Sequence, residues 1–453
     1  MRNHNEWSCV VSVSERRQGS HASNQVARHQ AGSLPKASPA PPPLPATPAG
    51  QPGRSVAAER RVRLGAKDSI EITNGRDRLT RTLISATVVA AMSVASFTCA
   101  AEPAYLPGGE AVKKAVEARR GKTDLSKLAA SMKPASWAQL KTEMPQGLWS
   151  SPKVNGGRNK GGAGGLHIAG WTDDAHWDSR TGQFLYLGLR QTRQFIAYSE
   201  EKNAWRVISL DRTSDNPVFR TRFGHVYGTN GFDHERSRFY HLYRSFEQLE
   251  GGISYFHVAT EKWTKLPPRP AGSGGMCIEY FGAMDGLVVL GKQMWIFRHD
   301  RQKWENLGES PVDGYHSMFR HNPYRDEVLM AGGNHAPRVV ARLKKDGQIE
   351  RLNDSPVPLS IRGDKVTVDP VSGRYLILGG KKDEPKKLYE FDSGRNEYRL
   401  VEAFMAGWPF SRYAMPVVAF IPEYGVTMWA EKSVFLYKHD ARPAGNGKRE
   451  EPQ

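Results

Sequence analysis

Histidine, tyrosine and arginine recur together in short polar segments that precede apolar runs along the chain. The candidate catalytic residues in these segments are His225, Tyr227, Tyr315, His316, Arg362 and Arg412. Tyr413 and the basic residues of a second set of polar segments, Arg190, Arg193, Arg244, Arg338 and Lys381, are candidates for substrate binding. Arginine neutralises a carboxylate and the enolate that develops beside it, and a histidine or tyrosine of suitable pKa transfers the proton. These residue types fit β-elimination at a uronic acid.

Each role in that reaction has two candidates: His225 or Tyr315 as the base, Tyr227 or His316 as the acid, and Arg362 or Arg412 as the group that holds the carboxylate. The structural alternative is that these side chains only hydrogen-bond to neighbouring parts of the fold. His225, His316 and His335 also suggest a site for a divalent transition metal, because three imidazoles near one axis can hold such an ion. Beyond this metal ion, the sequence identifies no cofactor.

The segments that must position these residues repeat along the chain. A turn residue precedes the second strand of a unit by six positions in four places: Asp178 and Phe184, Asp233 and Phe239, Asn322 and Val328, Asp369 and Tyr375. An apolar residue precedes a tryptophan or its replacement by seven positions in five places: Tyr198 and Trp205, Phe256 and Trp263, Phe297 and Trp304, Leu343 and Glu350, Phe391 and Tyr398. Repetition at a period of about 40–60 residues is typical of propellers and arrays.

Each repeated unit is expected to contain four strands, as in DKVTVDP, GRYLILGG, KKLYEFD and NEYRLVE of the fifth unit. The units begin near 172, 226, 275, 315, 363 and 413, and the sixth lacks its outer strand. Residues 147–154 (GLWSSPKV) could supply that strand, which would remove the open edge between the first and last units. The sequence therefore predicts an all-β propeller of six blades, with five to seven possible, in which the loops that carry the candidate residues share one face.

The repeats resemble those of the kelch β-propeller family. The resemblance rests on apolar strands that end in Gly-Gly (LMAGG at 329–333, LILGG at 376–380), an aromatic residue in the next strand, and the later Trp205, Trp263 and Trp304. It covers about residues 170–440. Some polysaccharide lyases are propellers of this kind, and the resemblance implies such a fold without fixing the function.

The remaining segments predict an exported protein. Residues 1–75 are a disordered Pro/Ala/Ser-rich extension, and the true start is expected to lie downstream of Met1. Residues 76–101 have the basic, apolar and small-residue regions of a secretory signal, with cleavage near Ala100 or Ala101 and a secreted or periplasmic product. Residues 102–146 form a short helical lead-in, 147–440 the propeller and 441–453 a disordered tail. No transmembrane span is expected in the mature chain.

The net charge indicates the kind of partner to expect, and the cysteine count indicates whether disulfides are to be expected. The net charge is +17, and the chain has three cysteines, two of them in the segments expected to be absent from the mature protein, so no disulfide framework is predicted. A basic surface attracts an anionic partner, but no basic helix, zinc spacing or aromatic RNA platform predicts nucleic-acid binding. We expect a monomer that binds an anionic polysaccharide or oligosaccharide.

Three functions follow from these observations. The leading one is an exported propeller that binds an anionic carbohydrate, with polysaccharide lyase activity as its enzymatic form. The alternative is a non-catalytic recognition or envelope-scaffold propeller. A copper-radical oxidase, suggested by Tyr315-His316-Ser317 followed by AGGN, ranks behind both, because no separate C-terminal domain remains and Cys277 beside Tyr280 is typical of a core thiol.

Overall fold

The computed structural model describes residues 106, 108–150, 167–169, 172, 175–188, 194–208, 228–243, 252–270, 277–312, 315–361, 363–380, 384–411 and 414–440. The chain divides into the units Met1–Ala91 and Met92–Gln453, and all described residues belong to the second. The predicted extension, signal segment and C-terminal tail lie outside the described residues. Within the described part, no helix is long and apolar enough to cross a membrane.

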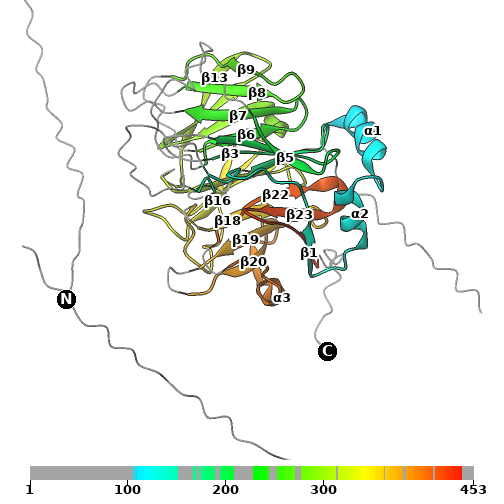
Figure 1. Cartoon of the computed structure of the whole chain (residues 1–453). Helices are drawn as coiled ribbons and strands as arrows, with labels where there is room; N and C mark the ends of the chain where they lie inside the picture. Colours follow the sequence, from blue (N-terminus) through cyan, green and yellow to red (C-terminus); the bar gives the residue numbers. More distant parts are fainter. Residues whose placement is uncertain are drawn as a thin grey trace, which may run out of the picture. The chain divides into compact units, whose positions relative to one another are not determined.

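The described strands form six antiparallel sheets of four strands each (Figure 1). Blade one holds β2 (Ala175–Asp178), β3 (Gln183–Gly188), β4 (Gln194–Ser199) and β5 (Ala204–Ile208). Blade two holds β6 (Asn230–Asp233), β7 (Arg238–Tyr243), β8 (Gly252–His257) and β9 (Lys262–Lys265). Blade three holds β10 (Cys277–Phe281), β11 (Gly286–Leu290), β12 (Gln293–Arg298) and β13 (Lys303–Glu309).

The second half of the ring follows the same plan. Blade four holds β14 (Met318–Asn322), β15 (Glu327–Ala331), β16 (Val340–Lys344) and β17 (Ile349–Arg351). Blade five holds β18 (Lys365–Val368), β19 (Tyr375–Gly379), β20 (Lys387–Asp392) and β21 (Glu397–Leu400), with α3 (Glu402–Ala406) after it. Blade six holds β22 (Val417–Ile421), β23 (Val426–Ala430), β24 (Val434–Lys438) and, from far upstream, β1 (Ser136–Leu140).

The first strand of each blade lies at the centre of the ring. Strand β2 contacts β6 and β22, β10 contacts β6 and β14, and β18 contacts β14 and β22. These contacts close the circle, which confirms the predicted all-β, six-bladed propeller. The apolar cores lie between facing blades, as in the cluster that joins blades three, four and five.

The first sequence repeat, a turn residue six positions before a residue of the second strand, corresponds to the turns that follow the inner strands. The Asp178 carboxylate accepts hydrogen bonds from the Arg180 amide at 3.1 Å and the Thr181 hydroxyl at 2.7 Å, and Asp369 accepts from the Ser372 amide at 2.8 Å. An Asp or Asn side chain of this kind fixes a tight turn by bonding to the backbone two or three residues on. Blades three and six use the short 3₁₀ helices η2 (Gly282–Met284) and η3 (Pro422–Tyr424) instead.

The second repeat corresponds to a ring pair across the two outer strands. Tyr198 lies opposite Trp205, with ring centroids 5.5 Å apart, and the matching pairs in blades two, three and five also face each other. Blade four differs from the prediction, because Leu343 lies opposite Ile349 and not Glu350. Its turn at Gly347 is one residue shorter, so Glu350 lies opposite Arg342 and forms an ion pair at 2.9 Å.

An N-terminal strand closes blade six, as expected, but it is not the predicted one. Strand β1 pairs with β24, with Trp137 opposite Tyr437, whereas 147–154 was predicted to supply this strand. Leu148 and Trp149 are instead buried against blade one, where the Ile168 amide donates to the Trp149 carbonyl at 2.9 Å. The strand at 136–140 was assigned to the helical lead-in, because its short sequence SWAQL follows residues of helical composition.

The described lead-in also contains two helices, as predicted: α1 (Gly109–Arg119) and α2 (Asp124–Ser131). Figure 1 shows both helices along one side of the propeller. Arg119 forms an ion pair with Glu200 of blade one at 2.8 Å and lies 3.6 Å from Glu423 of blade six. Thr123, the N-cap of α2, donates to Glu200 at 2.6 Å. The lead-in therefore fastens the joint where the ring closes.

The two ends of the ring are named by what lies there. At the hairpin end, each inner strand turns into the second strand, and turns of neighbouring blades touch: the Asn322 side chain donates to the Gly373 carbonyl at 2.9 Å. At the loop end, the chain enters the inner strands. There the Ile278 amide donates to the Gly228 carbonyl at 2.7 Å, which joins blades two and three.

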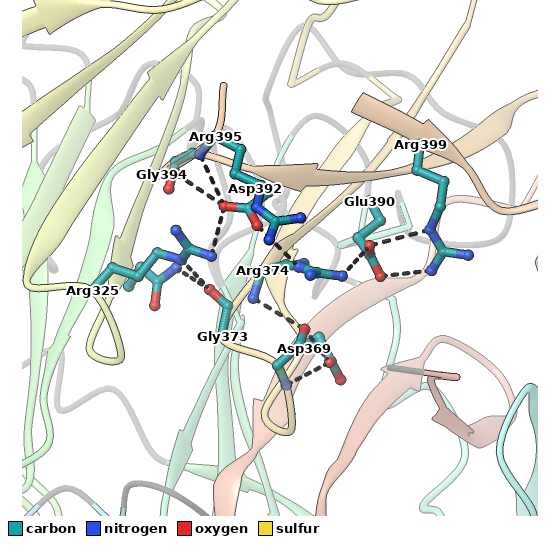
Figure 2. A network of polar contacts seen from close by, with 12 residues as sticks. Arg325, Asp369, Gly373, Arg374, Glu390, Asp392, Gly394, Arg395 and Arg399 are labelled. Carbon is teal, nitrogen blue, oxygen red and sulfur yellow. Dashed lines mark hydrogen bonds and ion pairs between the residues drawn. The ribbon is translucent and has the colours of Figure 1, made fainter. Parts of the chain in front are cut away.

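Arginines and carboxylates link three blades at the hairpin end. Figure 2 shows Arg374 between Asp392 and Glu390, with Arg325 and Arg399 on the outer sides of these carboxylates. His439, which follows β24, contacts Glu390 at 2.5 Å. Burial works against the charge of Glu390, but hydrogen bonds from His439 and Arg399 lower its pKa to about 2. The network therefore joins blades four, five and six.

Candidate functional site

A buried lysine lies at the loop end of the ring. Lys365 is the first residue of β18 and is 1% exposed. Its Nζ donates to the Thr172 carbonyl at 2.8 Å. Thr172 precedes blade one, and blade six separates blades five and one in the ring. The Lys365 side chain therefore reaches past blade six to the segment before blade one, and we call it the axial lysine.

Charged side chains of blades five and six surround the axial lysine. Asp364 forms an ion pair with Lys386 and accepts from the Ser360 amide at 2.7 Å. Burial raises the pKa of Asp364, and the positive charge of Lys386 opposes this shift. Burial also raises the pKa of Glu431, an effect that Lys432 and then Lys365 oppose. Both carboxyls are therefore held near positive charge at the mouth of the channel.

Glu431 also holds the segment that leads into blade one. His167 Nε2 lies 3.3 Å from the Glu431 Oε1 atom, and His167 Nδ1 accepts from the Ala169 amide at 3.3 Å. Because Nδ1 accepts a hydrogen bond, the neutral ring carries its proton on Nε2. The Nε2 atom lies at ion-pair distance from the carboxylate but does not hydrogen-bond to it. Burial, and then Lys432, lower the pKa of His167. The neutral imidazole is therefore the favoured form.

Blade four contributes a phenol and an imidazole to the same end. The Tyr315 and His316 rings stack with centroids 4.2 Å apart. His316 is buried, and its Nδ1 lies 2.7 Å from the Asn334 side-chain oxygen. The backbone amide of Asn334 donates to the Tyr315 carbonyl at 3.1 Å. Tyr315 is 38% exposed, so its ring lies at the surface on a fixed imidazole.

The other predicted site residues divide into two groups. Those outside the described residues are His225, Tyr227, Arg362, Arg412, Arg190, Arg193, Arg244, Lys381 and Tyr413. Of the described ones, His335 is exposed on the loop after β15. Arg338, on the same loop, donates to the carbonyls of Ser355 at 3.0 Å and Pro356 at 2.8 Å, so its guanidinium fixes a neighbouring loop.

A metal site is not formed by the described residues alone. Among them, no group of three or more His, Cys, Asp or Glu side chains is placed to hold a metal ion. The predicted set of His225, His316 and His335 includes a residue outside the described part, so it stays a prediction.

A second layer of ionisable side chains lies next to the axial lysine, toward the hairpin end. Arg320 Nε donates to the carbonyl of Val366, the residue after Lys365, at 3.1 Å. Arg320 NH1 lies 3.9 Å from Glu279, and both side chains are buried. Burial raises the pKa of Glu279 to about 7, while Arg320 opposes the rise.

Three buried histidines lie in this layer or beyond it toward the hairpin end. Burial lowers the pKa of His234 to about 4 and that of His321 to about 3, and it holds His176 well below its usual value. Arg320 adds to all three shifts. The Nε2 atom of His176 is buried without a hydrogen-bond partner. Lys365, Glu279 and Arg320 were not among the predicted site residues, because the candidates were taken from the polar segments outside the strands. The charged residues inside these short strands were the available signal.

Comparisons with known proteins identify no family for the chain. No family model matches the chain, and no curated protein matches it. Among solved structures, a structural-genomics protein of unknown function from Bacteroides thetaiotaomicron is 12% identical, with a TM-score of 0.45 over 67% of this chain and 75% of that one. A nidogen/laminin complex is also 12% identical, with a TM-score of 0.38 over 55% of this chain and 86% of that one.

Proposed function

We propose that the chain is an exported, kelch-like propeller that binds an anionic carbohydrate at its loop end as a monomer. The observation that supports this most is the axial lysine, a buried ammonium group that reaches past blade six at the end where the candidate arginines are predicted to gather. An ammonium in a mouth with low-dielectric walls attracts anions more strongly than one on an open surface. Export through residues 76–101, with cleavage near Ala100 or Ala101, belongs to the same proposal.

The geometry of the ring supports a shared mouth for residues far apart in the sequence. All six inner strands lie side by side, and the turns that follow them meet at the hairpin end. We expect the segments that precede the inner strands to border the opposite opening. Arg362 and Arg412 directly precede blades five and six in the chain. Guanidinium groups at such positions suit carboxylate or sulfate groups, which they bind in a bidentate manner.

The binding test compares Lys365→Met with a matched lysine elsewhere. The full-length protein is titrated calorimetrically with uronic-acid and sulfated polysaccharides. Loss of the ammonium should weaken binding by about tenfold to a hundredfold, the value of a hydrogen bond to a charged group. Lys303→Met removes the same charge from the exposed start of β13 and should leave the affinity within about twofold. Equal effects of the two changes, or no binding by the wild type, would reject the proposal.

A second candidate function is β-elimination at a uronic acid, and one observation favours it. Tyr315 presents an exposed ring that stacks on the buried His316 imidazole, which Asn334 orients. A fixed phenol–imidazole pair at the mouth could serve proton transfer. In this scheme Tyr315 takes the proton beside the uronate carboxylate, and an arginine stabilises the enolate. The enolate then collapses to the unsaturated sugar as the glycosidic C–O bond at the β carbon breaks, and His316 gives a proton to the leaving oxygen.

The lyase test follows the ultraviolet absorbance of the unsaturated sugar produced by elimination. Tyr315→Phe keeps the ring and removes the hydroxyl group, so it should lower kcat by at least about a hundredfold with little change in fold. The outcome that favours the non-catalytic recognition propeller is persistent binding of uronic-acid polymers with no new absorbance and no loss of chain length.

A further inference from the structure

Glu279 is a buried carboxyl group held by both neighbouring blades. It lies on β10 of blade three and is 3% exposed. Its Oε2 accepts from the His321 amide of blade four at 3.3 Å, and the Phe232 amide of blade two also bonds to it. Blade two approaches closely here: a Cβ on Gly231 would lie 3.1 Å from the Glu279 Cα. The carboxyl group is therefore fixed at the inner edge of the ring.

The contact between Glu279 and its cation is long. Arg320 NH1 lies 3.9 Å from Glu279 Oε2, a charge interaction without the shorter approach of a hydrogen bond. The same guanidinium donates through Nε to the Val366 carbonyl, beside the axial lysine. Glu279, Arg320 and Lys365 thus form a connected series of charges that leads inward from the loop end.

An anion at the axial lysine would lie in the field of this series. A negative Glu279 repels the anion, and a neutral Glu279 leaves more of the Arg320 charge to attract it. Thermodynamic linkage requires the reverse effect as well: a bound anion favours the protonated form of Glu279. The sign of this coupling does not depend on which anion binds.

We propose that Glu279 takes up one proton from solvent when an anionic carbohydrate binds at the axial lysine, so that binding tightens as the pH falls. The inference rests on the proposed function. The step adds a proton to the Glu279 carboxylate and breaks no other bond. Proton uptake of this kind makes affinity a reporter of the pH outside the cell.

The other ionisable side chains beside Glu279 do not reverse the expected tightening of binding as the pH falls. Arg320 faces Glu279 from β14 and stays charged, and His321, His176 and His234 lie nearby on β14, β2 and the turn after β6. With pKa values held low by burial, the three imidazoles stay neutral between pH 6 and 8. Glu279, with a pKa of about 7, is the one of these five side chains that titrates there.

The experiment measures proton uptake directly. The full-length wild type is titrated with a sulfated oligosaccharide, whose own charge is constant between pH 5.5 and 8, in two buffers of different ionisation enthalpy. We expect an uptake that approaches one proton per site near pH 8 and an affinity that rises about tenfold from pH 8 to pH 5.5. Binding with no proton uptake would overturn this inference and leave the proposed function standing. No binding at any pH would overturn both.

Two variants with the same charge change locate the effect. Glu279→Gln imitates the protonated carboxyl group, so it should bind about tenfold more tightly than the wild type at pH 8, equal it at pH 5.5 and lose most of the proton uptake. Any uptake that remains in this variant belongs to Asp364 and Glu431 beside the axial lysine. Glu261→Gln removes a carboxylate from an exposed ion pair with Arg206 on the outside of the ring and should keep the wild-type proton uptake. A pH dependence in Glu279→Gln equal to that of the wild type would overturn the inference. If that variant does not fold, the wild-type proton count decides alone.

Discussion

The hairpin end and the loop end of the propeller use positive side chains differently. At the hairpin end, Arg325, Arg374 and Arg399 each contact a carboxylate within one network (Figure 2). At the loop end, Arg338 donates to two peptide carbonyls, which do not neutralise its charge, and Lys365 reaches a carbonyl past blade six. The first arrangement ties blades together, whereas the second, under the proposed function, would face an anionic ligand. Stability and binding should therefore be separable by which end is changed.

The largest effect on stability is expected at the centre of the hairpin-end network. Glu390→Ala leaves the cations of Arg374, Arg399 and His439 without their shared carboxylate. Removal of one partner from a buried ionic network costs about 3 kcal/mol of unfolding free energy. Urea unfolding measures this loss. Glu305→Ala, in partly exposed ion pairs with Arg298 and Arg301 on an outer strand, should cost less than about 1 kcal/mol. Neither change should alter anion affinity.

The same carboxylate predicts how this end responds to acid. The pKa of Glu390 is lowered to about 2 in the folded protein from an ordinary 4.5. A lowered carboxyl pKa contributes stability above pH 4.5, and this contribution is lost as the pH falls from 4.5 toward 2. Unfolding free energy measured from pH 6 down to pH 2.5 should fall more steeply in the wild type than in Glu390→Gln. Parallel curves would contradict the assignment.

A smaller effect is expected from the turns of the hairpin end. Gly373 has φ of 66°, and an added Cβ would lie 2.7 Å from the Tyr324 Cβ of blade four. Gly373→Ala should therefore lower the unfolding free energy by about 2 kcal/mol, from backbone strain and the clash. At Gly347, in an outer turn with φ of 84°, an added Cβ would meet only the Met284 Cε atom, at an ordinary contact distance of 3.9 Å. Gly347→Ala therefore measures the backbone strain without a clash and should cost about 1 kcal/mol. Equal losses would mean that the contact between blades four and five is easily shifted.

The smallest stability change is expected at the loop end. Arg338→Met removes an exposed guanidinium that donates to two carbonyls, so the unfolding free energy should change by no more than about 0.5 kcal/mol. Anion affinity should nevertheless fall about twofold to fivefold, because a positive charge near the mouth is lost. A large loss of stability here would contradict the division of roles between the two ends.

Local signals predicted the blades because the residues involved act locally. Asp178 and Asp369 bond to the backbone of their own turns, and Tyr198 and Trp205 face each other across one hairpin, so their spacing in the sequence is fixed. Strand β1 was placed wrongly, because its partner β24 lies far along the chain and SWAQL carries no sign of that distance. The axial lysine was missed for a similar reason: its reach past blade six depends on the closure of the whole ring.

The join between β1 and β24 also has a consequence for how the chain acquires its structure. Trp137 emerges from the ribosome about 300 positions before Tyr437, its cross-strand partner. At about 5–20 residues per second, this strand waits tens of seconds for the other half of its sheet. Contacts of such long sequence separation form slowly. A chaperone that binds nascent chains would find its longest-lived target in the segment around Trp137, and the ring can close only after synthesis is almost complete.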